Sequence, residues 1–382
     1  MPDTPGRARG LGALAAYVGG ALGPLGGGIV APLLPDMAAS LHTTRSAAAA
    51  SLTVYLAVFA GVQLVSGTLG ERWGRRRTVR AAYLGYAAAT LLCAIAPSLG
   101  LLLAGRALQG AANAFTTPLL IAGLAELVPA ARLSRAVGTY ASWQAAGLSL
   151  APLVGGLFGE FSWRVAFVVV AVVSGLLALV PPPGGARAAV RPRWRALLSG
   201  RLGLLSIASF ASFAGSNGLP FLVALYARDR FGTGPAQAGA VIVGFGLAGI
   251  ALGPLWGSVA GRIGARRAAA LGAVAVAPLV AAVGVTGHPV VLAVVWTATG
   301  AAASLLTVAL QRLALDAVPD NRGGAVSVAS ALRFTGSAAA PLLWLPIYQR
   351  QHGAGFLAAA AVVLAVLPCV ALLRDPAPPP PD

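Results

Sequence analysis

Charge is scarce in this sequence. Only 10% of its 382 residues are charged, whereas a soluble domain usually has about 25%. Polar side chains are too few to cover a water-soluble particle of this size, which excludes an ordinary soluble protein. Lysine is absent, so all 27 basic residues are arginine, and the net charge is +17. The arginines stand in short runs between apolar stretches rather than on one polar face, which argues against nucleic acid as a partner.

Residues that could catalyse a reaction or hold a metal are also few. Cys93 and Cys369 lie far apart in apolar segments, so no disulfide or metal-ligand spacing is present. No cluster of histidines or carboxylates lies within an apolar segment, which argues against a membrane-embedded enzyme. There is no G-x-x-x-x-G-K-S/T motif for ATP, and no connecting segment is long enough for the soluble domain of a receptor. We therefore expect no enzyme, no metal and no cofactor.

Apolar residues dominate instead, at 58% of the chain, with a mean hydropathy of +0.81. A bilayer core of about 30 Å needs roughly 20 apolar residues in a helix, and on this basis we expect an all-α membrane protein with twelve spans. The first span follows a basic flank, as a signal peptide does, but its apolar run is too long for one, so we expect it to be retained. The predicted spans are residues 11–34, 47–69, 79–97, 100–123, 136–158, 163–181, 203–226, 237–259, 268–286, 290–311, 325–347 and 354–373.

The two halves of the chain repeat one another. Residues 67–77 read GTLGERWGRRR and residues 257–267 read GSVAGRIGARR, 190 positions further on, and the same offset relates Glu126 to Asp316. Duplicated halves built of apolar helices are typical of transporters, whose substrate site lies where the halves meet. We predict an N-terminal six-helix bundle at 1–180, a Pro- and Arg-rich linker at 181–202 and a C-terminal six-helix bundle at 203–382.

The distribution of arginine predicts the orientation in the membrane. If the N-terminus is inside, twenty arginines lie in inner loops or at inner ends of spans and five lie outside. Because inner loops carry the excess of basic residues, both termini and the linker are expected in the cytoplasm. The protein is then a multi-pass protein of the plasma (inner) membrane.

Three motifs resemble those of the major facilitator superfamily. They read GTLGERWGRR at 67–76, LLAGRALQG at 102–110 and GLSLAPLVGG at 147–156. The family more often has Asp at the position of Glu71, and Gly-Pro where this chain has Ala151-Pro152. The combination is similar to the twelve-span drug:proton antiporter branch. The resemblance implies a monomer with two six-helix bundles, which exports small drug-like molecules by alternating access against proton entry.

The first and third motifs are expected to form the gate. A carboxylate on Glu71 can face the N-terminus of the span that begins near Gly323, where unpaired N–H groups attract negative charge. An ordinary solvated loop acid is the alternative. Arg75 or Arg76 could pair with Glu126, or could serve only to set orientation, and the proline of the third motif could bend its span or simply allow close packing. The predicted gate residues are Gly67, Glu71, Arg72, Gly74, Arg75, Arg76, Glu126, Pro152, Gly155 and Gly156.

A substrate cavity is expected from polar residues inside the spans. Arg106 lies well inside the fourth span, where a charge costs several kcal/mol, so it must face a wet cavity or a partner such as backbone carbonyls. Gln109 and Asn113 follow at i+3 and i+7 on the same helical face. Arg333 is a second candidate cation. The predicted cavity residues are Arg106, Gln109, Asn113, Gln144, Asn217 and Arg333.

A carrier for the coupled proton is sought among the acidic residues. None of the ten acidic residues lies in the middle of a span, and Asp36 at the outer end of the first span is the nearest candidate for carrying a proton. Two buried arginines without a central acid favour an organic-anion carrier as the alternative to a drug:proton antiporter. A sugar carrier of the same fold also stays open.

Overall fold

The computed structural model describes residues 4–181, 194–233 and 235–373, and no strand occurs among them. The prediction of an all-helical fold is confirmed. In the first half the helices are α1 (Thr4–Gly28), α2 (Val30–Ser40), α3 (Arg45–Trp73), α4 (Arg75–Ile95), α5 (Leu99–Ala114), α6 (Thr116–Leu127), α7 (Ala130–Gly159) and α8 (Trp163–Leu179). In the second half they are α9 (Gly200–Ser212), α10 (Pro220–Phe231), α11 (Pro235–Ile263), α12 (Ala265–Val283), α13 (Pro289–Leu315), α14 (Arg322–Arg350), α15 (His352–Leu364) and α16 (Val366–Ala371).

Each predicted span corresponds to one helix or to a broken helix. Within the described residues, eight helical stretches are long and apolar enough to cross a membrane, and α1 with α2, bent by 55°, forms a ninth candidate. The fourth span is interrupted at Phe115, and the seventh is interrupted by the π-helical segment η2 (Phe213–Asn217), where the amide of Gly218 donates to the carbonyl of Phe213. Such π segments are frequent at functional sites.

Helix starts follow the capping chemistry of the sequence. The hydroxyl of Thr44 accepts a hydrogen bond from the amide of Ala47 at 3.1 Å, and Ser98 and Ser199 cap α5 and α9 in the same way. Such caps satisfy amides that have no partner in the first turn.

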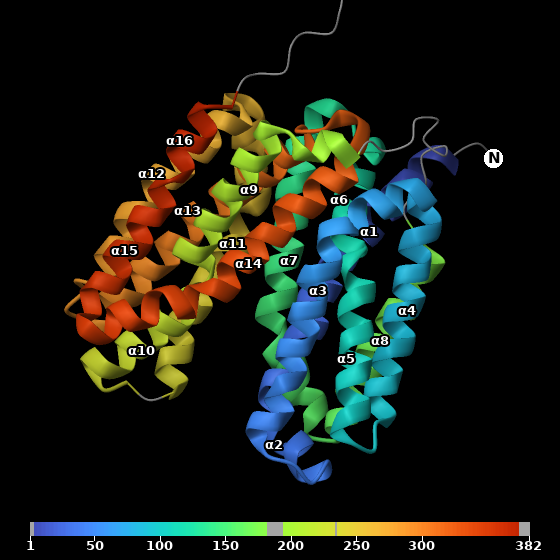
Figure 1. The fold of residues 1–382 in the computed structure, drawn as a ribbon, viewed down its shortest axis with the longest axis horizontal. Coiled ribbons are helices and arrows are strands. Elements are labelled where there is room, and N and C mark those ends of the chain that lie inside the picture. The colour runs from blue at the N-terminus through green and yellow to red at the C-terminus, as the bar shows by residue number, and fades with distance from the viewer. Residues whose placement is uncertain (1–3, 182–193, 234, 374–382) are drawn as a thin grey trace, which may run out of the picture.

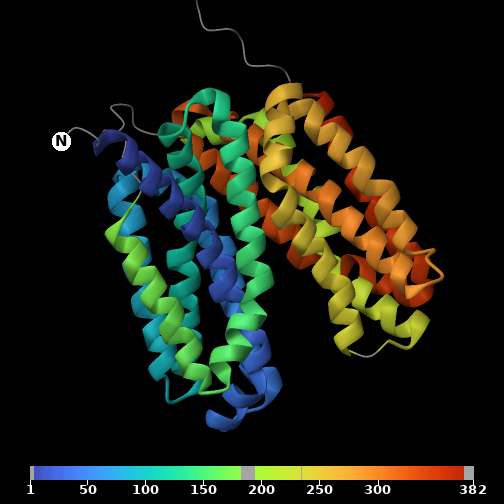
Figure 2. The ribbon, with the colours of Figure 1, turned by 180° about the vertical axis from the view of Figure 1, so that it is seen from behind.

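The helices form two bundles, each with an apolar core, and side chains of α13 and α14 from the second half also pack into the core of the first. Figures 1 and 2 show the bundles in contact at the end where α1 starts and α16 ends, and diverging toward the end that carries α2 and α10. Most of the predicted linker, residues 182–193, lies outside the described residues. The boundaries 1–180, 181–202 and 203–382 therefore stay a prediction.

Equivalent turns in the two halves have the same backbone shape. Gly74 links α3 to α4 with φ +95°, and Gly264 links α11 to α12 with φ +87°. A residue with a Cβ is strained at positive φ. The duplicated sequence motif thus encodes a duplicated turn, and the predicted gate residue Gly74 is required by its conformation.

Candidate functional site

The bundles meet closely where α3 packs against the start of α14. A Cβ on Gly67 would overlap the carbonyl group of Gly323. The amide of Gly67 donates a hydrogen bond to Ser327 Oγ at 3.1 Å, and Ser327 Oγ in turn donates to the carbonyl of Gln63. Only glycine allows two helix backbones to approach so closely. Gly67 therefore lies in the contact that closes this end of the molecule.

Asn321 joins the same two helices. Its Oδ1 accepts a hydrogen bond from the amide of Gly324 at 3.0 Å and so caps α14, while its Nδ2 donates to Thr68 Oγ1 of α3 at 3.0 Å. One buried side chain thus caps α14 and also forms a hydrogen bond to α3 of the other bundle. Asn321 was not among the predicted site residues, although an Asn shortly before a predicted span is a recognisable cap.

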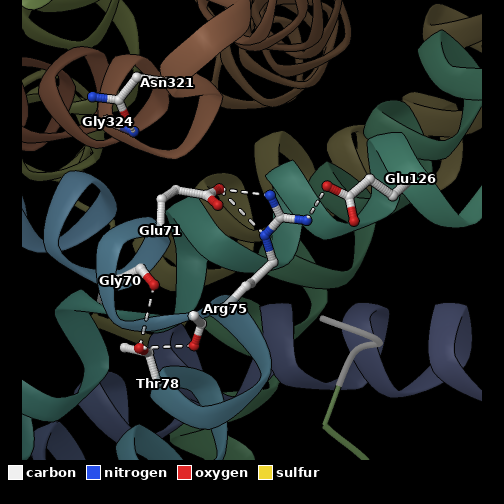
Figure 3. Close-up of polar contacts among 8 residues, drawn as sticks. Gly70, Glu71, Arg75, Thr78, Glu126, Asn321 and Gly324 are labelled. Atoms are coloured by element: carbon white, nitrogen blue, oxygen red, sulfur yellow. Dashed lines mark hydrogen bonds and ion pairs between the residues drawn. The ribbon is translucent and has the colours of Figure 1, made fainter. Parts of the chain in front are cut away.

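The charged residues of the first motif form a network at this closed end (Figure 3). Arg75 is 7% exposed and lies between two carboxylates, with Nη2 2.6 Å from Glu71 Oε1 and Nη1 2.8 Å from Glu126 Oε1. Arg75 and Glu126 thus form the predicted pair. Glu71 Oε1 also lies 2.9 Å from the point where a Cβ of Gly323 would stand, so it lies near the start of α14, and its role as a latch there stays a prediction. Arg72 and Arg76 are exposed.

The second half of the chain makes an equivalent contact with the first. A Cβ on Gly257, the repeat counterpart of Gly67, would overlap the carbonyl of Ser134 in α7. Further along, Gly138 of α7 packs against Gly253 of α11, and Ser142 Oγ donates to the carbonyl of Gly249 at 3.4 Å. Two equivalent glycine contacts therefore close this end, one between α3 and α14 and one between α11 and α7.

The third motif lies within α7, which is a single helix. A Cβ on Gly155 would overlap the carbonyl of Ile29, where α1 ends. This contact fits the close-packing interpretation of the motif. The side-chain surroundings of Pro152 and the packing at Gly156 lie outside what the structure describes.

Between the bundles lies a cavity of about 380 Å³. Four of the six predicted cavity residues line it: Asn113, Gln144, Asn217 and Arg333. Gln144 of α7 also accepts a hydrogen bond from Gln311 of α13 at 3.3 Å, across the two halves. The remaining wall is largely apolar and aromatic, with Tyr55, Phe59, Phe213, Phe245 and Phe334 among its residues. The cavity suits a small organic molecule with a substantial apolar part.

Arg106 and Gln109 do not line this cavity, contrary to the prediction. Arg106 is fully buried behind Tyr55, whose ring lies 4.3 Å from its guanidinium carbon. It donates to the carbonyls of Gly26, Gly27 and Ser51 at 3.0, 3.4 and 3.3 Å, and to the side chain of Gln109. Two of these carbonyls belong to the last turn of α1, next to its bend into α2. Carbonyls freed at a helix break attract a cation, so the carbonyl-bonding alternative describes Arg106.

The proton-coupling candidate Asp36 does not line the cavity either. It is exposed on α2 and is not among the residues that line the space between the bundles. The role predicted for it would have to operate at the outer end of the first span.

Some cavity residues, such as Phe59 and Phe245, were not predicted, and the internal repeat is the signal that could have found them. Seven pairs separated by 190 positions contribute both members to the lining. The pairs are Gly23 and Phe213, Gly27 and Asn217, Tyr55 and Phe245, Leu56 and Gly246, Phe59 and Gly249, Thr117 and Thr307, and Gln144 and Phe334. Equivalent positions of the two halves thus face one central space.

The sequence matches a known protein family and is similar to several transport proteins. Residues 16–234 and 205–382 match the family described as the Major Facilitator Superfamily. The chain is 34% identical over 156 residues to the multidrug efflux pump LfrA of Mycolicibacterium smegmatis, which covers 40% of this chain and 31% of LfrA. It is also 34% identical over 159 residues to the puromycin resistance protein of Streptomyces alboniger, which covers 41% of this chain and 31% of that protein. Both alignments span less than one third of the relative's own length.

A solved structure shares the fold over nearly the whole chain. The human organic anion transporter MFSD10 superposes with a TM-score of 0.78 at 18% identity, covering 96% of this chain and 100% of that one. The predicted fold of two six-helix bundles is therefore confirmed.

Proposed function

The chain belongs to the Major Facilitator Superfamily, and we propose that it is a secondary transporter that exports small, drug-like organic compounds across the plasma membrane by alternating access. The observation that carries this proposal is the cavity of about 380 Å³ that residues of both bundles line. The same bundles are in contact at one end, through α3 with α14 and α7 with α11. Rocking two bundles about a central site exposes that site to one side at a time.

We propose the direction of transport from the distribution of arginine and from the similarity to known export proteins. The closed end carries the Arg-rich turns between α3 and α4 and between α11 and α12. Under the positive-inside rule this end is cytoplasmic, so the cavity faces outward in this conformation. Export is supported by the similarity to LfrA and to the puromycin resistance protein.

We assign the role of inner gate to the closed end. In this role Gly67 allows the helices to meet, and Glu71 stabilises the contact through the N-terminus of α14. Arg75 holds Glu71 in place while it also binds Glu126. When the gate opens, Glu71 loses the helix N-terminus but keeps Arg75, which belongs to the same bundle.

Proton entry is the driving force we propose, with Asp36 as the group that carries the proton. No acidic residue lines the cavity among the described residues. A second candidate function, an organic-anion carrier, is favoured by Arg333, which does line it.

Transport by the purified full-length chain in proteoliposomes tests the proposal. A pH gradient is imposed, and uptake is measured for a panel of drugs, sugars and organic acids. We expect at least one compound to accumulate well above the level in protein-free liposomes, and the Gly67→Leu variant, which cannot close the α3–α14 contact, to lose most of that uptake. A panel in which no compound exceeds the protein-free level would contradict the proposal.

A further inference from the structure

The central cavity contains one formal charge and no counter-ion. Among the described residues that line it, Arg333 alone is charged. Its side chain is only 5% exposed. The described part of the chain gives it neither a salt bridge nor a hydrogen bond, and its Nε is a buried donor without a partner. An unpaired charge removed from water costs several kcal/mol, so this arginine needs a partner that the described residues do not supply.

Two aromatic rings position the guanidinium without satisfying it. Its central carbon lies 4.7 Å from the ring centre of Phe334 and 5.0 Å from that of Phe213. Ring faces attract a cation, but the five N–H donors of a guanidinium project in its own plane. The rings therefore fix the orientation of the plane and leave its donors available. Phe213 belongs to the π segment η2, which places it at the cavity wall.

Arg106 provides an internal comparison. It is the other arginine inside a span, and it too is buried against an aromatic ring. Yet its donors reach three backbone carbonyls and one side-chain amide. Among the described residues, the fold thus gives every nitrogen of Arg106 a hydrogen-bond partner in one bundle and leaves Arg333 at the cavity unpaired.

We propose that Arg333 binds the anionic group of the transported compound, so that the substrates are small organic anions, above all carboxylates attached to an aromatic or apolar body. A carboxylate accepts two parallel hydrogen bonds from the planar fork of arginine. The apolar body would lie against Tyr55, Phe59 and Phe245, which line the same cavity. The substrate anion supplies the counter-ion that the described lining lacks. This inference rests on the proposed function and names the substrate class for it.

A matched set of ligands tests the inference on the full-length protein in nanodiscs of neutral lipid. The probes are 2-naphthoate, its neutral isostere 2-naphthamide and the cation 2-naphthylmethylammonium, with dissociation constants measured by calorimetry. We expect the carboxylate to bind at least about tenfold more tightly than the amide, as hydrogen bonds to a charged group allow, and the cation to bind most weakly.

Variants assign this preference to one residue. Arg333→Gln should remove the advantage of the carboxylate over the amide, and Arg333→Lys should keep part of it. Arg350→Gln is the matched control, because Arg350 is exposed at the far end of the same helix and its loss should leave the ratio unchanged. The wild-type comparison of the three ligands does not depend on the folding of any variant.

The outcomes separate this inference from the proposed function. Equal binding of carboxylate and amide by the wild type, tighter binding of the cation, or an unchanged ratio in Arg333→Gln would overturn the role of Arg333. The same holds if inorganic chloride binds at Arg333 while none of the three probes binds. In each of these cases the proteoliposome panel still decides whether the protein transports any compound. If it transports only the neutral or cationic compounds of the panel, the anionic substrate class alone is refuted.

Discussion

A single methyl group at Gly67 should shift the conformational equilibrium of the protein. In the closed contact the added Cβ would overlap the carbonyl of Gly323, and it would stand 2.7 Å from Ser327 Cβ. Both neighbours are rigid, since one is helix backbone and the other is the first atom of a side chain. The helices α3 and α14 can relieve the overlap only by moving apart. Gly67→Ala is therefore expected to favour the state in which this end is open.

The size of the shift follows from the cost of overpacking. Inserting a methyl group into a filled contact costs about 1–3 kcal/mol, and each 1.4 kcal/mol is about a tenfold change in an equilibrium constant. The population of the closed state relative to the open one should fall by about fivefold to about a hundredfold. Alanine also favours helix over glycine by about 1 kcal/mol, but this effect is common to both states.

Gly61→Ala is the control for that common effect. Gly61 lies on the same helix, and a Cβ there meets nothing within 4 Å. Spin labels at Arg80→Cys and Arg267→Cys, both exposed at the closed end but in opposite bundles, report the separation by pulsed dipolar spectroscopy. We expect a longer distance to dominate in Gly67→Ala only. If Gly67→Ala and Gly61→Ala give the same distance distribution as the parent, the steric account of the gate is wrong.

Four further predictions follow from the same geometry. Glu71→Gln should fold but lower the initial transport rate in proteoliposomes severalfold, because an amide loses most of its attraction to a helix N-terminus, whereas Glu71→Asp should keep most of the rate. Arg106→Leu should lower the unfolding temperature in detergent by several degrees, since it leaves buried carbonyls unpaired, whereas Arg333→Leu should leave it unchanged or raise it, since it removes an unpaired charge. Gly264→Ala should cost about 1–3 kcal/mol of stability through its positive φ, seen in the same melting assay. Asp36→Asn should abolish pH-driven uptake while substrate exchange survives, if this acid couples the proton; full pH-driven uptake would remove Asp36 from that role.

The sequence was most informative where a short motif carries the feature. The turn at Gly74 follows from one motif and its copy at the 190-residue offset. The pairing of Arg75 with Glu126 was predicted from opposite charges at the inner ends of spans. Glu71 lies near the start of α14, where a carboxylate is attracted to a helix N-terminus, and its part in gating stays a prediction.

The two buried arginines show where such reasoning stops. Arg106 and Arg333 are alike in sequence, since each is a single charge inside an apolar span. What distinguishes them is the chain packed beside each one. Arg106 meets carbonyls at the broken end of α1, and that break was not visible in the continuous apolar run at 11–34. Arg333 contacts two phenylalanine rings and is one of the residues that line the cavity. The segments packed beside each arginine determine what it does, and these tertiary neighbours could not be predicted from composition.

Locking the closed end tests alternating access most directly. Thr68 and Asn321 meet across the bundles at 3.0 Å, so Thr68→Cys with Asn321→Cys, in a chain whose Cys93 and Cys369 are replaced by alanine, should form a disulfide on oxidation. We expect oxidation to stop substrate uptake into proteoliposomes and reduction to restore it, while either single cysteine variant is unaffected by oxidant. Undiminished uptake by the fully cross-linked protein would contradict transport through the central cavity by opening of this end.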